Sequence, residues 1–572
     1  MGDVLPIIRT ILLLVGLSLY GVSAFGQAFS GGAGVQQRRA PGQESLPREE
    51  LDVPQVAPEL VLPPLAPPDD AGRLSAQLRV FVRKFRFEGN QIFTDSELAI
   101  ITAPYEGRVI TSAELQRVRN EVSLFYLNKG YINSGAIIPD QKVEDNVITL
   151  QIIEGGLTRV EIAGNTHLTS GYLISRLKRA AGKPLNIEAL EKELKILQQH
   201  RLIKRLHAEL KPGDRLGESV LRVQLEENRP GRVDVSFNNY RPPSVGAEQV
   251  EIDATYYSLT GHDDTLTAYF GHTRGLDDLF LSYRLPVNSH DTRVGVYFQT
   301  TDSEVVEEPF DELDIESDAK TWGVIVTHPL RRTPAGHLTA GMALERRHSN
   351  TSLGGIPFPF SEGVGNDGRA DVTPVRLSID WLSRDLDSVL AARSVVSMGI
   401  DALGATTNND APDGRFVAWS GQFQWLQRFG QRGYQAVIRA SAQLTNDALL
   451  PLEKFVVGGH DTVRGYRENQ LVRDNGFTAS AELRIPIFQG EGAAAQWQIA
   501  PFVDYGNAWE EEADTPDPRD ITSVGAELRW QPTRRLQASV SAAHAFENID
   551  RVDQDRDLQD RGIQFLLSYQ LF

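Results

Sequence analysis

The chain has 572 residues, no cysteine and a formal net charge of −18 at pH 7. The lack of cysteine excludes disulfides and thiolate metal sites. The acidic balance argues against a nucleic-acid-binding protein, because such proteins usually carry a basic excess that neutralises phosphate. The length is sufficient for several domains.

The first residues have the order of a secretory signal peptide. Arg9 precedes an apolar run from Ile11 to Tyr20, and small residues follow at Ala24 and Gly26. The run has only about half of the roughly 20 residues that a membrane-spanning helix needs. We therefore expect residues 1–26 to be a cleaved signal rather than a membrane anchor.

Residues 27–78 are rich in Pro, Gln and Gly and show no hydrophobic period. Such a composition is typical of an extended, semi-rigid linker. The segment from Ser45 to Leu51 is the candidate for a short helix within it, although Pro47 interrupts the pattern.

Residues 79–229 contain the same unit twice, with a period of about 75 residues. "FRFEGNQIFTDSEL" from Phe85 is echoed by "VEIAGNTHLTSGYL" from Val160, and each copy continues with a helical pattern and two strand-like runs. Thr111 and Glu114 form a capping box, and Asn186 can cap a helix in the second copy. The pattern predicts two small βααββ domains, at 79–155 and 156–229.

From about residue 230 the hydrophobic period becomes two. In "YQAVIRASAQL", Tyr434, Ile438 and Leu444 share one face, and about 16 such segments follow one another to the end of the chain. The connections are alternately short and long, and most of the long ones are acidic. This parity favours a 16-stranded antiparallel transmembrane β-barrel over 230–572, with the two N-terminal domains on the short-turn side.

A soluble all-β sandwich would also alternate and is the alternative for this region. Regular loop parity counts against it. So do tryptophans near segment ends, namely Trp381, Trp425, Trp497 and Trp530.

The connection at 447–475 differs from the other long loops. It contains "GGHDTVRGYRENQLVRDNG", in which Gly458 and Gly459 permit positive φ and Arg464 offers a five-donor fork suited to a buried carboxylate. The alternation of "PFVDYGNAW" turns Asp504 into the lumen, and Glu482 and Arg484 of the preceding strand face the same way. From the residues alone, two interpretations stay open. Arg464 and Asp504 form an ion pair, or Arg464 is a solvated loop residue and Asp504 an ordinary hydrated residue of the lumen.

This order of parts resembles the outer-membrane transporters of two-partner secretion, the translocators of haemolysins and filamentous adhesins in the POTRA-barrel superfamily. The resemblance covers nearly the whole mature chain. It implies that the repeats are polypeptide-transport-associated (POTRA) domains and that the loop folds back into the barrel, where its arginine contacts the aspartate. The residues it singles out as a lumen latch are Val463, Arg464, Gly465, Tyr466, Phe502, Asp504 and Gly506.

The resemblance also implies a function. The expected protein is an outer-membrane pore of a Gram-negative bacterium, with periplasmic POTRA domains that bind a large unfolded partner carrying an N-terminal secretion domain. Contact with outer-membrane lipid and insertion by the barrel-assembly machinery follow from the same likeness. In the family an N-terminal helix often plugs the pore, for which 45–51 is the candidate here.

The sequence contains no nucleophile elbow, no His-Glu-x-x-His and no phosphate-binding loop, so we expect neither an enzyme nor a cofactor, metal or nucleotide. The His-Asp pairs at 262–263 and 290–291 fall in predicted turns, where polar residues need no catalytic explanation. Two alternatives stay open: an insertase of the same superfamily, whose members usually carry more POTRA repeats, and a diffusion porin.

Overall fold

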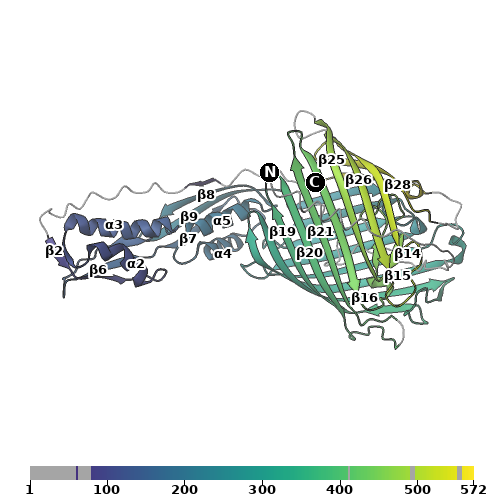
Figure 1. Ribbon diagram of the computed structural model, residues 1–572, viewed down its shortest axis with the longest axis horizontal. Helices are drawn as coiled ribbons and strands as arrows, with labels where there is room; N and C mark the ends of the chain where they lie inside the picture. Colours follow the sequence, from purple (N-terminus) through teal and green to yellow (C-terminus); the bar gives the residue numbers. More distant parts are fainter. Residues whose placement is uncertain (1–58, 62–78, 410–411, 490–495, 550–556) are drawn as a thin grey trace, which may run out of the picture.

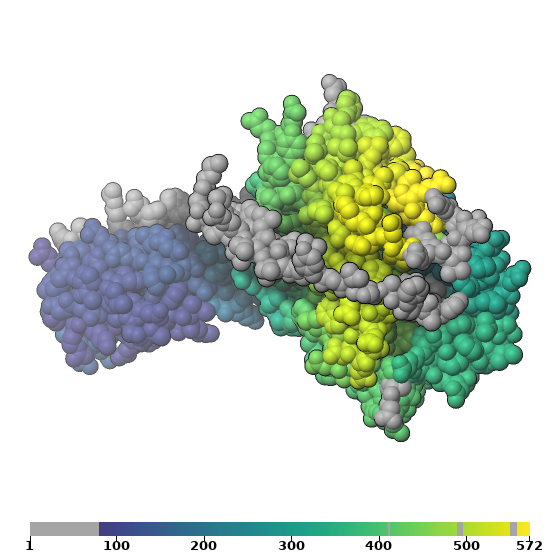
Figure 2. Space-filling model, turned by 45° about the vertical axis from the view of Figure 1, so that its right-hand side comes forward, coloured from purple at the N-terminus to yellow at the C-terminus, as the bar shows by residue number. Residues whose placement is uncertain are grey.

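The computed structural model describes residues 59–61, 79–409, 412–489, 496–549 and 557–572. The predicted signal peptide and the candidate plug helix lie outside these residues. Two small α+β units follow each other and project from one end of a large β-barrel (Figures 1 and 2). Within the described ranges, no helix is long and apolar enough to cross a membrane.

The first unit packs two helices on a three-stranded sheet of order β3-β6-β5, in which β3 and β6 are parallel. The predicted capping box is confirmed, since Thr111 and Glu114 make both of its hydrogen bonds. The βααββ prediction omitted one feature: β2 and β4 form a separate two-stranded sheet, so that a strand lies between the helices. The elements are β2 (Arg79–Val82), β3 (Lys84–Glu88), α2 (Asp95–Thr102), η1 (Ala103–Tyr105), β4 (Arg108–Thr111), α3 (Ser112–Asn128), β5 (Gly135–Ile137) and β6 (Val147–Ile153).

The second unit has the predicted βααββ order, and Asn186 caps its second helix as expected. Leucines of both helices, such as Leu177 and Leu194, are fully buried against the sheet. One short strand comes from the segment predicted to be a linker: β1 (Glu59–Val61) pairs in parallel with β8. The unit consists of β7 (Gly156–Ala163), α4 (Ser170–Ala181), α5 (Ile187–Gln198), β8 (Ile203–Pro212) and β9 (Glu218–Glu227).

All remaining strands except β23 and β24 belong to an antiparallel barrel, which is closed because β10 pairs with both β11 and β29. Closure excludes the sandwich alternative, and the prediction of 16 strands is confirmed; the two-residue β17 (Ile356–Pro357) and the short β18 (Arg369–Val372) are extra pairings on β16. The 16 strands are β10 (Gly231–Asn238), β11 (Gln249–Tyr257), β12 (Thr265–His272), β13 (Leu276–Pro286), β14 (Arg293–Glu304), β15 (Ile315–Thr333), β16 (Gly336–Leu353), β19 (Pro374–Arg384), β20 (Ser388–Gly399), β21 (Val417–Phe429), β22 (Tyr434–Thr445), β25 (Asn475–Gln489), β26 (Gln496–Trp509), β27 (Asp520–Gln531), β28 (Leu536–Ala545) and β29 (Ile563–Gln570).

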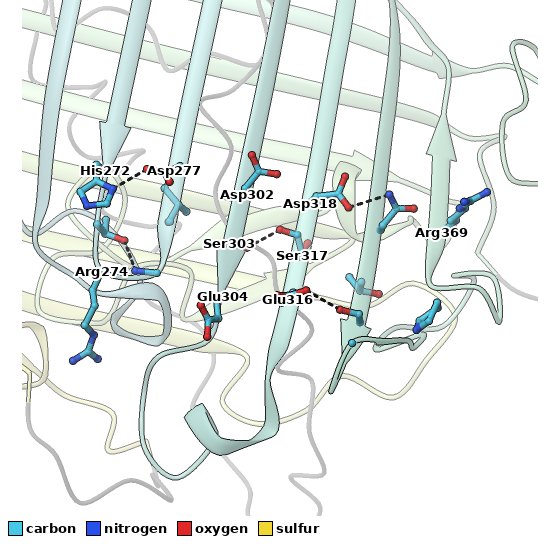
Figure 3. A pocket seen from close by; sticks show the side chains of 18 of the residues that line it. His272, Arg274, Asp277, Asp302, Ser303, Glu304, Glu316, Ser317, Asp318 and Arg369 are labelled. Carbon is cyan, nitrogen blue, oxygen red and sulfur yellow. Dashed lines mark hydrogen bonds and ion pairs between the residues drawn. The ribbon is translucent and has the colours of Figure 1, made fainter.

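The outer face of the barrel is an apolar band with a charged edge. On β15, Trp322 and Val324 point outward and are exposed, whereas the alternate residues Thr321, Gly323 and Ile325 are buried. Towards the long loops the outward positions become acidic. Asp277, Asp302 and Asp318 stand directly opposite one another on β13, β14 and β15 and line a shallow pocket (Figure 3). This row marks where the lipid-facing band ends.

Candidate functional site

The loop between β22 and β25 folds into the barrel. It spans residues 446–474, one residue earlier at each end than predicted, because Asn475 already belongs to β25. Two short strands, β23 (Phe455–Val457) and β24 (Leu471–Arg473), pair to make a ribbon. Apolar side chains of the ribbon and tip pack on Ala508 and Ile521 of the inner wall.

Two glycines shape the turn that carries the tip. Gly458 and Gly459 have φ values of +111° and +99°, a region that side chains rarely adopt. A Cβ at Gly459 would lie 2.0 Å from the carboxylate of Glu468, which accepts a hydrogen bond from the backbone N–H of His460 at 2.6 Å. The tip therefore folds around a buried carboxylate that leaves no room for a side chain at this position.

Arg464 is the centre of the site and is 3% exposed. Its Nε and Nη2 donate to the two oxygens of Asp504 at 2.8 and 2.9 Å, and its backbone N–H donates to the same carboxylate at 3.1 Å. The guanidinium lies over the ring of Phe502, with Cζ 3.4 Å from the ring centroid. Bidentate pairing and a cation–π contact together fix both the position and the orientation of the fork.

Further charges of the wall surround this pair. Arg464 Nη1 donates to Glu482 Oε2 at 2.8 Å, and Arg484 Nε donates to Glu482 Oε1 at 2.8 Å, so both predicted lumen charges belong to the cluster. Sequence reasoning missed Glu527, which lies 3.4 Å from Arg464 Nη1. A signal existed: "AELR" occurs at 481–484 and again at 526–529, with the glutamate inward in both copies.

The other motif residues meet at the same wall. A Cβ at Gly506 would lie 2.9 Å from Val463 Cγ2, so the glycine makes room for the valine. The Tyr466 hydroxyl donates to the Thr522 carbonyl at 2.9 Å and accepts from the Glu547 N–H at 3.0 Å. The structure thus brings together all seven residues singled out from the sequence.

Gly465 gives a direct test of how the tip is seated. Its φ is +92°, and a Cβ would lie 2.8 Å from Ala543 Cβ. Gly465→Ala should displace the tip at a cost of about 1–3 kcal/mol and make the folded barrel sensitive to trypsin after Arg464 and Arg467, detected by mass spectrometry of the released peptides. Gly354→Ala is the control, because its φ is also positive but no atom lies within 4 Å of its Cβ position. Equal protection of the tip in both variants would contradict this account.

A second buried cluster joins the second α+β unit to the barrel. Arg176 of α4, 1% exposed, donates through Nη1 and Nη2 to the oxygens of Asp291 at 2.7 and 3.0 Å. Asp291 lies in the turn between β13 and β14. Arg176 also donates through Nε to Glu193 of α5 at 3.2 Å. The guanidinium is therefore shared between the unit's own helices and the base of the barrel.

Asp263, in the turn between β11 and β12, is the second contact of this junction. It accepts from the Tyr172 hydroxyl at 3.1 Å and lies 2.7 Å from His200 Nε2. Burial raises the pKa of Asp263, but His200 and Arg293 lower it by more, so that the pKa lies below its usual range. Asp263 and Asp291 lie in turns, where the sequence analysis expected ordinary polar residues. Both contact α4 and so join the second α+β unit to the barrel, a role that no local pattern indicated.

Comparisons with known proteins agree with this architecture. The family model described as "Haemolysin secretion/activation protein ShlB/FhaC/HecB" matches residues 217–530, and that of the ShlB-type POTRA domain matches residues 80–155. The heme/hemopexin transporter protein HuxB of Haemophilus influenzae (strain 86-028NP) is 21% identical over 484 residues, covering 81% of this chain and 83% of HuxB. The outer membrane transporter CdiB of Dickeya dadantii is 22% identical over 71% of this chain and 73% of its own.

Solved structures share the fold. CdiB from Escherichia coli superposes with a TM-score of 0.65 at 20% identity, covering 88% of this chain and 94% of that one. BamA from Haemophilus ducreyi without its POTRA domains 1–3 gives a TM-score of 0.53 at 15% identity, over 86% of this chain and 100% of that one.

Proposed function

Because this chain belongs to the ShlB/FhaC/HecB family of haemolysin secretion/activation proteins, we propose that it moves one large, unfolded secreted partner through its barrel to the cell surface. The chain is an outer-membrane two-partner secretion transporter of a Gram-negative bacterium, and its POTRA domains lie in the periplasm. Relatives carry the names heme/hemopexin transporter, outer membrane transporter and hemolysin transporter. The partner here is expected to be an exported protein with an N-terminal secretion domain.

The observation that carries the proposal is the inward loop. A barrel of 16 strands encloses an aqueous lumen, which must be obstructed when no polypeptide passes. The loop 446–474 lies in this lumen and is held there by Arg464 on Asp504 and Glu482. We assign the seven motif residues to a latch that keeps the loop in the conformation competent for secretion.

The POTRA domains are proposed to bind the partner as an added strand. Backbone hydrogen bonds at a sheet edge require little sequence specificity, which suits an unfolded polypeptide. In the second unit β8 already pairs with β1, so we expect the partner at the β7 edge or on the first unit's sheet. No nucleotide hydrolysis takes part: folding of the partner outside the cell gives the direction of transport.

Coexpression tests this function. The chain is produced with the large exported protein encoded beside its gene, in a host that lacks both. We expect the partner in the culture medium only when both are present. Secretion without the chain would contradict the proposal. Assembly defects in other outer-membrane barrels would instead favour an insertase, and small-solute uptake without secretion would favour a porin.

A further inference from the structure

The inward loop carries a second buried ionic cluster, at its base. Glu453, at the end of the short helix η4 (Pro451–Glu453), is 3% exposed. It accepts from Arg347 Nη1 of β16 at 2.7 Å and from Arg376 Nη2 of β19 at 2.9 and 3.0 Å. Arg376 Nε also lies 3.1 Å from Glu345 Oε2, on β16.

Neighbouring contacts close the base of the loop. Leu449 and Leu450 are buried in an apolar cluster with residues of β18 and β21. The Leu449 N–H donates to Asp474 Oδ1 at 2.9 Å, which joins the start of the loop to its end. Lys454 Nζ lies 3.3 Å from Asp474 and 2.8 Å from Glu510. The base is thus held by packing and by charge together.

The two clusters have opposite polarity. At the tip the loop supplies a cation, Arg464, and the wall of β25, β26 and β27 supplies the anions. At the base the loop supplies an anion, Glu453, and the wall of β16 and β19 supplies the cations. At the base wall, Arg464 would meet Arg347 and Arg376, and like charges repel in a buried site. The tip therefore cannot take the position of the base, and the loop has one favoured placement in the barrel.

The clusters also differ in what release would leave behind. Release of the tip takes Arg464 away from Asp504 and leaves Glu482 with Arg439 and Arg484, and Glu527 with Arg529. Release of the base takes one carboxylate, Glu453, away from two arginines, Arg347 and Arg376, which are at most 5% exposed. A buried uncompensated charge is strongly unfavourable. Both ends therefore resist release, but the base is also held by the buried leucines and by the Leu449–Asp474 hydrogen bond, next to the points where the loop leaves β22 and enters β25. The base is thus the end of the loop that stays in place.

We propose that Glu453 is the fixed anchor of the loop, and that the ribbon β23–β24 with its Arg464 tip pivots about it. Glu453 is in this sense a positioning residue, which acts through the loop and not on the secreted partner. Its importance for transport rests on the proposed function, whereas the anchoring itself does not.

The native chain has no cysteine, so single-cysteine reporters can follow each end of the loop separately. Leu452→Cys reports on the base and Thr462→Cys, at a position 8% exposed, on the tip. The rate of labelling by a membrane-impermeant maleimide is measured on the folded barrel. Arg464→Ala should raise labelling at 462 by roughly tenfold or more and leave 452 unchanged, whereas Glu453→Gln should raise labelling at 452. Asp302→Asn, the same change of charge on the outer face, should alter neither rate.

Two results would overturn the proposal: labelling at 452 that rises in Arg464→Ala, or that stays at the native rate in Glu453→Gln. If Glu453→Gln does not fold, Glu453→Gln with Arg347→Gln removes the excess positive charge and is tested in the same way. Labelling needs no secreted partner. The expected labelling pattern together with normal secretion by Arg464→Ala would therefore contradict the latch and leave the anchor standing.

Discussion

Arg464→Ala is expected to abolish secretion of the partner while the barrel stays assembled. The substitution removes two charge-assisted hydrogen bonds to Asp504 and one to Glu482, each worth about 1.5–3 kcal/mol. Because 1.4 kcal/mol is a factor of ten, the seated population of the tip should fall by roughly a hundredfold or more. The strand pairing of the barrel does not depend on this side chain. Secreted partner is measured by immunoblot of the medium, and barrel assembly by heat-modifiable electrophoretic mobility.

Arg464→Lys separates the shape of the side chain from its charge. Lysine keeps the positive charge but lacks the planar fork that spans both oxygens of Asp504. We expect partial secretion, between that of the native chain and that of Arg464→Ala. Native secretion by the alanine variant, with an assembled barrel, would refute the latch.

Arg176→Ala is expected to loosen the second POTRA domain from the barrel. It removes two charge-assisted hydrogen bonds to Asp291 and one to Glu193, each worth about 1.5–3 kcal/mol, although Arg332 and Arg179 stay beside these two carboxylates. Spin labels on cysteines at Lys192 and Arg432, in α5 and in the turn between β21 and β22, report the distance between the two parts by pulsed EPR. A narrow distribution in the native protein should become broad, and secretion should fall.

Arg179→Ala is the matched control on the same helix. Arg179 is about one-third exposed and lies 3.4 Å from Glu193, so its removal should leave the distance distribution narrow. A narrow distribution in Arg176→Ala would show that other contacts, such as that of Tyr172 with Asp263, are sufficient for docking.

The alternation of apolar and polar residues was enough to predict the barrel, because each strand has lipid on one face and water on the other. A shift of one residue would turn every side chain to the wrong face, so the same alternation also fixes the register. Tyr434 and Ile438 therefore located β22 without knowledge of its partners. The Arg464–Asp504 pair was different: its residues lie 40 positions apart, and only the resemblance to known transporters joined them.

What the sequence did not reveal are ionic partners on distant segments. Glu453 is one acidic residue in a loop, and nothing local shows that Arg347 and Arg376 of the barrel wall contact it. Asp263 and Asp291 are typical turn residues, and only the placement of α4 gives them a partner. The β1 pairing was hidden because a Pro-rich composition shows no strand period.

The central claim is that a polypeptide passes along the lumen wall beside the Arg464 cluster. Strand β26 offers a matched pair of reporters: Gln498 lines the interior at the short-turn end, and Val503 points outward and is 49% exposed. The partner is stalled in transit by fusion to a fast-folding domain, and a photocrosslinker is placed at either position. We predict crosslinks to the partner from position 498 and none from 503; absence of crosslinks from 498, with the stalled partner bound, would contradict the account.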